Sequence, residues 1–155
     1  MTNPLTLTPT DPEAPEARAC LAAYFALLQD RVPGVSAAHV PDPDPDADDF
    51  RPPHGRFLLA RLGPRPIGCV SLRRFDAGSG EVKRLWVDAA ARGRGVARAL
   101  MAALENEARR LGMSHLVLDT NAALPEAVAL YRATGWQKIP PYTGPPADCW
   151  FGKPL

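Results

Sequence analysis

The segment from Glu81 to Gly112 constrains the fold of this chain more than any other part of it. Its first residues, Glu81 to Val87, predict a strand, and a short turn containing Gly93 and Gly95 follows. The residues after the turn predict a long helix, because apolar side chains recur at three- and four-residue steps. This apolar stripe consists of Ala97, Leu100, Met101, Leu104, Ala108 and Leu111. Gly112 lies just past the expected end of the helix, where glycine is a common terminator.

Further strands and helices are predicted on both sides of this segment. The expected strands lie around Leu5 and Leu7, at Arg56–Leu62, Pro66–Phe75 and His115–Asp119, and around Trp136–Ile139 and Trp150–Lys153. A helix is expected over Ala14–Asp30, and another begins at Pro125 and ends before Gly135. Residues 31–55 hold many Pro and Asp residues and predict a long loop with room for a helical turn, of the kind that often carries function. This order predicts a mixed sheet with helices on its faces, an α/β or layered α+β fold.

Length and composition indicate one domain, residues 1–155, of a protein that works in a reducing compartment. The hydrophobic fraction of 46% is typical of a globular protein, and no apolar run approaches the roughly 20 residues of a membrane span. The N-terminal residues Met1 to Thr10 lack the basic start and apolar stretch of a secretory signal. Three cysteines without metal-ligand spacing predict no metal site. We therefore expect a cytoplasmic protein that does not bind a membrane.

The net charge of +1 argues against general nucleic-acid binding, for which a domain is usually distinctly basic. The charges are nevertheless grouped. Asp42, Asp44, Asp46, Asp48 and Asp49 share one Pro-rich stretch, and Arg92, Arg94 and Arg98 share another. An acidic patch would suit a cationic acceptor and a basic patch an anionic cofactor, although runs of charge are commonly solvated loops.

The turn at Gly93 and Gly95 has the features of an anion site. The first turn of a helix presents backbone N–H groups without intrahelical partners, at the positive end of the helix dipole. Glycines there let a phosphate group approach the backbone. The turn lacks the third glycine and the distant acidic residue of the dinucleotide fingerprint, and it lacks the Gly-Lys-Ser/Thr of a Walker loop.

Two motifs resemble those of one known superfamily. Glu81-Val-Lys-Arg-Leu-Trp-Val87, followed by Arg92-Gly-Arg-Gly-Val-Ala97, resembles motif A of the GNAT superfamily of N-acetyltransferases. Ala127-Val-Ala-Leu-Tyr131, with Gly135-Trp136 after it, is similar to motif B of the same superfamily. The resemblance implies a twisted, mixed sheet of about six to seven strands with helices on both faces, splayed between the fourth and fifth strands.

The resemblance also implies acetyl-CoA as the cosubstrate, bound in the gap between the splayed strands. The backbone of Leu85, Trp86 and Val87 would pair with the pantetheine arm, and the N–H groups from Gly93 to Ala97 would hold the pyrophosphate. The implied cofactor-binding residues are Leu85, Trp86, Val87, Arg92, Gly93, Arg94, Gly95, Val96, Ala97, Arg98, Asn121 and Tyr131. In one position the chain departs from the pattern: Leu124 stands where relatives often carry an asparagine, and Asn121 is a candidate to replace it.

Two residues are candidate catalytic groups, because direct attack of an amine on a thioester needs a proton acceptor and a proton donor. Glu81 lies where many relatives carry a general base; the alternative is a polar residue at a strand end that faces solvent. Tyr131 resembles the tyrosine that protonates the leaving thiolate; the alternative is a half-buried helix aromatic.

The acceptor is the least determined part of the prediction. The walls of its site would come from Tyr24–Phe50 and Tyr142–Phe151, and their aromatic and acidic residues suit a small-molecule amine. Three alternatives remain open: a protein or peptide N-acetyltransferase, a non-catalytic acyl-CoA sensor, and a protein that binds another nucleotide at the turn. The resemblance also allows a homodimer, since relatives are often dimers.

Overall fold

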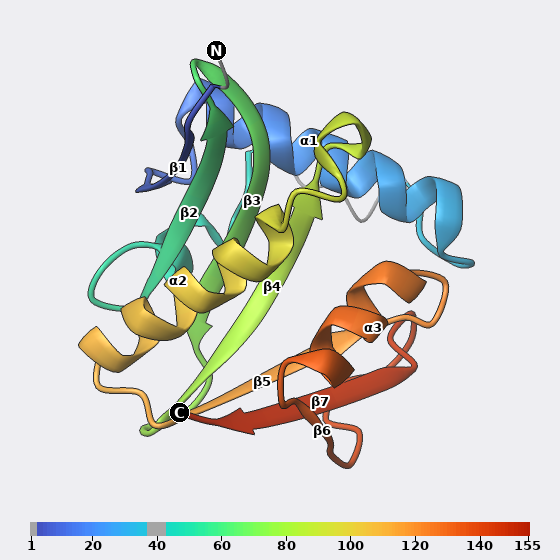
Figure 1. Cartoon of the computed structure of the whole chain (residues 1–155). Coiled ribbons are helices and arrows are strands. Elements are labelled where there is room, and N and C mark those ends of the chain that lie inside the picture. Colours follow the sequence, from blue (N-terminus) through green and yellow to red (C-terminus); the bar gives the residue numbers. More distant parts are fainter. Residues whose placement is uncertain (1–2, 37–42) are drawn as a thin grey trace.

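The computed structural model describes residues 3–36 and 43–155, which form one seven-stranded sheet with three α-helices (Figure 1). The helices are α1 (Pro15–Arg31), α2 (Val96–Arg110) and α3 (Pro125–Ala133), and two short 3₁₀ turns are η2 (Ala47–Phe50) and η3 (Ala89–Ala91). The strands are β1 (Leu5–Pro9), β2 (Gly55–Leu62), β3 (Arg65–Arg74), β4 (Ser79–Val87), β5 (His115–Thr120), β6 (Gln137–Lys138) and β7 (Cys149–Pro154). The predicted order of elements is confirmed, and the helical turn in the long loop is η2.

The sheet is mixed, with the strand order β1-β2-β3-β4-β5-β7-β6. Neighbouring strands are antiparallel except β4 and β5, which are parallel and pair over only three residues, from Ser79↔His115 to Glu81↔Val117. Beyond Glu81 and Val117 the two strands separate, and Figure 1 shows β4 running toward α1 while β5 runs beneath α3. The expected splay between the fourth and fifth strands is therefore confirmed.

A β-bulge in β4 lies just after the last residue that pairs with β5. Lys83 pairs with Ser71 and Trp86 with Cys69, so Arg84 and Leu85 together lie opposite the single residue Val70. Arg84 takes a positive φ of 60°. A bulge of this kind bends its strand and increases the local twist, which turns the end of β4 away from β5.

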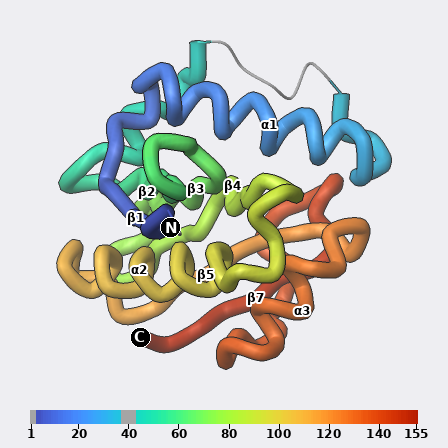
Figure 2. The backbone as a smooth tube through the Cα atoms, turned by 45° about the horizontal axis from the view of Figure 1, so that its top comes forward, coloured from blue at the N-terminus to red at the C-terminus, as the bar shows by residue number. Residues whose placement is uncertain are grey.

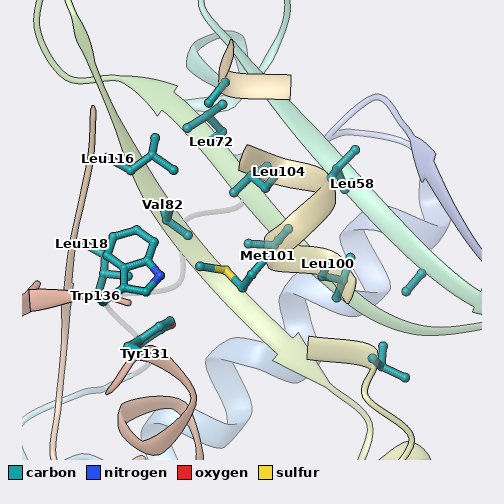
Figure 3. Packing of buried hydrophobic residues seen from close by; sticks show 14 of the residues in the cluster. Leu58, Leu72, Val82, Leu100, Met101, Leu104, Leu116, Leu118, Tyr131 and Trp136 are labelled. Atoms are coloured by element: carbon teal, nitrogen blue, oxygen red, sulfur yellow. The ribbon is translucent and has the colours of Figure 1, made fainter. Parts of the chain in front are cut away.

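Both faces of the sheet are covered, as predicted (Figure 2). Side chains of β2 alternate between the two faces, so Phe57 and Leu59 pack with α1, and Leu58 and Ala60 pack with the layer that contains α2. Burial on both sides explains why the central residues Phe57–Ala60 of this strand are all apolar. Figure 3 shows the larger cluster, in which Leu100, Met101 and Leu104 of α2 meet Leu58, Leu72 and Val82 of the sheet.

The helices begin and end as their sequences indicate. α2 begins after Gly95, whose φ is 71°, and Gly112, with a φ of 81°, follows its last turn. α3 begins at Pro125, whose missing N–H costs nothing at the first helical position. Among the described residues no helix is long and apolar enough to cross a membrane.

Candidate acetyl-CoA cleft and acceptor side

A cleft of about 410 Å³ opens where β4 and β5 separate. Its walls come from the end of α1, the end of β4, the turn before α2 and the start of α3. Nine of the residues expected at the cofactor line it, namely Leu85, Trp86, Val87, Arg92, Gly93, Gly95, Val96, Ala97 and Arg98. Arg94, Asn121 and Tyr131 are not among its lining residues. The structure therefore brings most of the predicted cofactor residues together at one opening.

The glycine turn leaves its backbone open to the cleft. Gly93 and Gly95 both have positive φ, 79° and 71°, and a Cβ atom built on either would meet no atom within 4 Å. The first-turn N–H groups of α2 follow directly and cannot be satisfied inside the helix. Asp88, just after β4, accepts a hydrogen bond from the Ala90 N–H and so caps the turn η3 before the glycines. The sequence thus builds a fixed turn with free N–H groups, which suits an anionic ligand.

Charged side chains meet at the mouth of the cleft. Glu126, in the first turn of α3, lies 2.6 Å from Arg31 Nη1 at the end of α1 and 3.7 Å from Arg92 Nη1. The hydrogen bond from Arg31 lowers the pKa of Glu126 below its ordinary value. Arg31 was not foreseen as part of this site, because only the fold brings the end of α1 to the start of α3.

The inner end of the cleft continues into a smaller cavity of about 200 Å³. Tyr24 and Leu124 line both spaces, and Lys83, Asp119 and Asn121 line the smaller one. The Asn121 side chain is held in its turn: it donates to the Pro146 carbonyl at 2.7 Å and accepts from the Ala123 N–H at 2.8 Å. Leu124, the residue that departs from the family pattern, precedes α3 and contributes an apolar wall.

Tyr131 is buried behind the cleft, with only 5% of its surface exposed. Its ring lies beside that of Trp136 (Figure 3), at a centroid distance of 5.8 Å, and packs against Phe151 at 5.9 Å. Burial raises its pKa well above the ordinary tyrosine value, and the nearby Tyr24 and Asp119 raise it further. The hydroxyl therefore keeps its proton at neutral pH. Tyr24 and Asp119, which raise its pKa, both line the small inner cavity.

Glu81 is buried rather than facing solvent, with a side-chain exposure of 3%. Its carboxylate accepts a hydrogen bond from Arg73 Nε at 2.9 Å and another from the Tyr142 hydroxyl at 2.8 Å, and Lys83 Nζ lies 3.4 Å away. The alternative of a solvated strand-end residue is thus wrong. Burial and this bond to Glu81 raise the pKa of Tyr142.

A second polar pair closes the base of the split. Lys83 Nζ lies 3.1 Å from Asp119 Oδ1, so a side-chain ion pair joins β4 and β5 immediately beyond their last backbone pairing. Thr143 donates to Asp119 Oδ2 at 2.8 Å, and Trp150 Nε1 donates to Thr143 Oγ1 at 2.8 Å. Sequence reasoning missed this network; the signal was the opposite charges of Lys83 in β4 and Asp119 near the end of β5.

A larger cavity of about 590 Å³ lies on the other side of Glu81. It is lined by Asp49, His54, Arg73, Arg74, Phe75, Asp76, Glu81, Tyr142 and Thr143. Asp49, Tyr142 and Thr143 belong to the predicted acceptor walls, and His54 and residues within 73–81 complete the lining. The structure thus places this open cavity and the 410 Å³ cleft on either side of the β4–β5 split.

The acidic segment carries less available charge than its sequence suggests. Asp44 forms an ion pair with Arg84 at 2.6 Å, Asp48 with Arg51 at 2.5 Å, and Asp49 lies 3.7 Å from Arg73. Asp42 lies outside the described residues. No group of three or more His, Cys, Asp or Glu side chains in the ranges 3–36 and 43–155 is placed to hold a metal ion.

A mixed sheet that splits beside a glycine turn at a helix N-terminus defines the class of acyltransferases that the two motifs predicted. The chain belongs to the Acetyltransferase (GNAT) family, whose sequence pattern matches residues 21–136. The predicted enzyme class, N-acetyltransferase, is thereby confirmed.

Three known proteins illustrate the similarity. An IAA acetyltransferase of Azospirillum brasilense is 36% identical over 114 residues, which are 71% of this chain and 74% of that protein. An acetyltransferase of Streptococcus agalactiae has a similar structure, with a TM-score of 0.80, 20% identity, and 97% of this chain and 98% of that chain covered. A GNAT family acetyltransferase of Elizabethkingia anophelis, solved with acetyl-CoA bound, has a TM-score of 0.67, 18% identity, and coverage of 97% and 98%.

Proposed function

We propose that this acetyltransferase moves the acetyl group of acetyl-CoA to the amine of a small molecule. The observation that carries the proposal is the position of the 410 Å³ cleft: the glycine turn lies at its mouth and the β4–β5 split at its inner end. Membership of an acetyltransferase family and the acetyl-CoA complex of the Elizabethkingia anophelis protein support the same cosubstrate.

In this proposal acetyl-CoA lies along β4 with its phosphates at the turn. The N–H groups from Gly93 to Ala97 bind the pyrophosphate, and Arg92 and Arg98 add positive charge at the cleft wall. The backbone of Leu85–Val87 pairs with the pantetheine arm, because β5 has already left this edge of β4. The thioester then lies near Tyr24 and Leu124, where the cleft meets the small inner cavity.

The acceptor amine attacks the thioester carbonyl directly, without a covalent enzyme intermediate. The new C–N bond forms as the C–S bond breaks, and the reaction moves one proton from the amine to the CoA thiolate. We assign Glu81 as the group that accepts the amine proton, through water, because its carboxyl group lies between the acceptor-side cavity and the split. Tyr131 supplies a proton to the thiolate, since its raised pKa keeps the hydroxyl protonated and its neighbours line the inner cavity.

A small-molecule acceptor fits the cavity on the far side of Glu81. The segment that carries Asp49 and His54 forms one wall and Tyr142 and Thr143 form another, so an acceptor would enter between two loops. The volume of about 590 Å³ is in the range of cavities that hold small ligands. The similarity to an IAA acetyltransferase supports the same substrate class.

The first test is thermal unfolding of the purified protein with rising acetyl-CoA, with CoA, ATP and NAD as comparison ligands. Ligand at 100 times its dissociation constant stabilises a protein by about 2.7 kcal/mol, which gives a clear shift in Tm. The variant Gly95→Glu places a negative side chain at the turn. Gly112→Glu is its matched control, because Gly112 also has a positive φ and open space but lies at the other end of α2.

We expect acetyl-CoA to raise the Tm of the wild-type protein and of Gly112→Glu but not of Gly95→Glu. A panel of amines with free-thiol release as the readout then identifies the acceptor. A folded wild-type protein whose Tm does not respond to millimolar acetyl-CoA would refute the proposed cofactor. Binding without thiol release for any amine, amino acid or peptide would instead favour an acyl-CoA sensor.

A further inference from the structure

Arg84 has the most unusual backbone in the described part of the chain. It is the one residue other than glycine with a positive φ there, at 60°. Side chains rarely adopt this conformation, because the Cβ atom crowds the neighbouring backbone. Such a residue persists only where its surroundings hold it, and these positions cluster at functional sites. Arg84 lies in the bulge that turns β4 away from β5, directly before the strand residues that line the cofactor cleft.

The side chain of Arg84 is enclosed by three partners. Its Nη1 atom lies 2.6 Å from Asp44 Oδ2, and its guanidinium lies 4.9 Å from the ring centroid of Phe50 and 5.3 Å from that of Phe25. Only 12% of the Arg84 side chain and 15% of the Asp44 side chain are exposed. Burial by itself raises the pKa of Asp44. The hydrogen bonds from Arg84 and from the Asp46 N–H, together with the positive charges of Arg84 and Arg73, outweigh burial, so the pKa of Asp44 is lowered.

These contacts join parts of the protein that are far apart in the sequence. Asp44 and Phe50 bound the segment 44–50, which includes η2 and Asp49, a wall residue of the acceptor-side cavity. Phe25 belongs to α1. On the other side, Leu85–Val87 continue the backbone of Arg84 into the cofactor cleft. One side chain therefore connects a wall of the acceptor cavity to the strand edge where the cofactor would lie.

We propose that Arg84 is a positioning residue that couples the two substrate sites. It anchors segment 44–50 to the bulge, so cofactor bound along Leu85–Val87 fixes the bulge and, through Arg84, the acceptor wall. The acceptor cavity then reaches its binding shape only with acetyl-CoA in place. This inference rests on the proposed function, since it takes the cleft as the acetyl-CoA site.

Hydrogen exchange of the full-length protein, with and without acetyl-CoA, tests the coupling without a known acceptor. The amides of Ala47, Asp49 and Arg51 report on the anchored segment, because each bonds to a carbonyl within it. Asp44→Asn removes the charge that holds Arg84. Arg84→Gly removes the guanidinium and leaves a residue that adopts positive φ freely, so backbone strain does not confuse the result. Asp46→Asn is the matched control, an exposed aspartate of the same segment.

In the wild-type protein we expect acetyl-CoA to slow exchange of these amides by about tenfold, since exchange follows the local opening equilibrium. In Asp44→Asn and Arg84→Gly we expect these amides to exchange faster without ligand and to show no response to acetyl-CoA. The affinity for acetyl-CoA should change by less than about threefold, because the residues that line the cleft are unchanged. Asp46→Asn behaves as the wild type does. With an acceptor in hand, the two variants raise the KM of the acceptor more than that of acetyl-CoA.

Two results would overturn the proposal. One is acetyl-CoA binding to the wild-type protein with no change in exchange over segment 44–50. The other is a response that persists in both Asp44→Asn and Arg84→Gly. A wild-type protein that binds no acetyl-CoA refutes the proposed function itself, and the coupling with it; exchange without ligand in the variants still decides whether Arg84 anchors the segment.

Discussion

Replacement of Glu81 by Gln separates a catalytic role of this carboxylate from a purely structural one. Glu81 is 3% exposed and lies within 3.4 Å of Lys83, with bonds from Arg73 and Tyr142. Removing one partner of a buried ion pair commonly costs about 3–5 kcal/mol. Here Arg73 and Lys83 remain 30% and 24% exposed, and they keep Asp49 and Asp119 as second partners. Each cation therefore keeps an acidic partner, and we expect a smaller loss of stability, about 2 kcal/mol.

For a chain of this size 1 kcal/mol shifts the Tm by roughly 2–4 °C, so Glu81→Gln should lower it by about 4–8 °C. If Glu81 accepts the amine proton, kcat falls in addition by about 10²- to 10⁴-fold. Tyr142→Phe is the control variant. It removes one hydrogen bond to the carboxylate, which costs about 1.5–3 kcal/mol, and leaves the charge in place.

The two variants should therefore have similar Tm values and very different rates. The assay is free-thiol release at saturating acetyl-CoA and acceptor, with Tm measured on the same preparations. Equal kcat in the two variants, at similar stability, would refute the assignment of Glu81 as proton acceptor. Glu81 would then have a structural role, in which its carboxylate holds Arg73, Lys83 and Tyr142 in place around the split.

Two further variants test the other parts of the site. Tyr131→Phe should leave Tm nearly unchanged, because the change conserves volume in the contact with Trp136 and Phe151, while kcat falls by about 10²-fold. Because the pKa of Tyr131 is raised, deprotonation of this residue should not lower the kcat of the wild-type enzyme below roughly pH 10. A decrease in kcat at a lower pH that disappears in Tyr131→Phe would contradict this prediction. Glu126→Gln removes the negative charge beside Arg31 and Arg92, and it should tighten acetyl-CoA binding by about twofold to fivefold at low salt, less at high salt. Calorimetric titration at two salt concentrations measures this effect, and weaker binding would mean that Glu126 itself contacts the cofactor.

The parts of the fold that the sequence predicted are those with a local signal. The apolar residues from Leu100 to Ala108 recur with the helical period, and Gly95 and Gly112 flank the helix. The bounds of α2 could therefore be predicted within a residue or two. The same local signal located the glycine turn and most of the cleft. That residues 1–155 form one domain stays a prediction.

The polar networks could not be predicted, because their partners are far apart in the chain. Tyr142 reaches Glu81 across 61 positions and Thr143 reaches Asp119 across 24. Arg84 gave no sign of its positive φ either, since arginine has no preference for that conformation and only its contacts with Asp44, Phe25 and Phe50 hold it. The sequence indicated the place of Tyr131 in the motif. It did not indicate that the side chain is buried behind the cleft, because this burial depends on contacts with Trp136 and Phe151.

The split leaves one edge of β4 open to a ligand. A strand inside a sheet normally pairs its backbone on both sides, and unpaired N–H and C=O groups are costly unless water or a ligand satisfies them. β4 loses its β5 partner after Glu81, whereas β3 continues to pair with it as far as Val87. One edge of Leu85–Val87 therefore faces the cleft with backbone groups that an extended chain with amide groups can satisfy. The pantetheine arm of acetyl-CoA is such a chain, and the Lys83–Asp119 ion pair, which joins the two strands at the base of the split, does not occupy that edge.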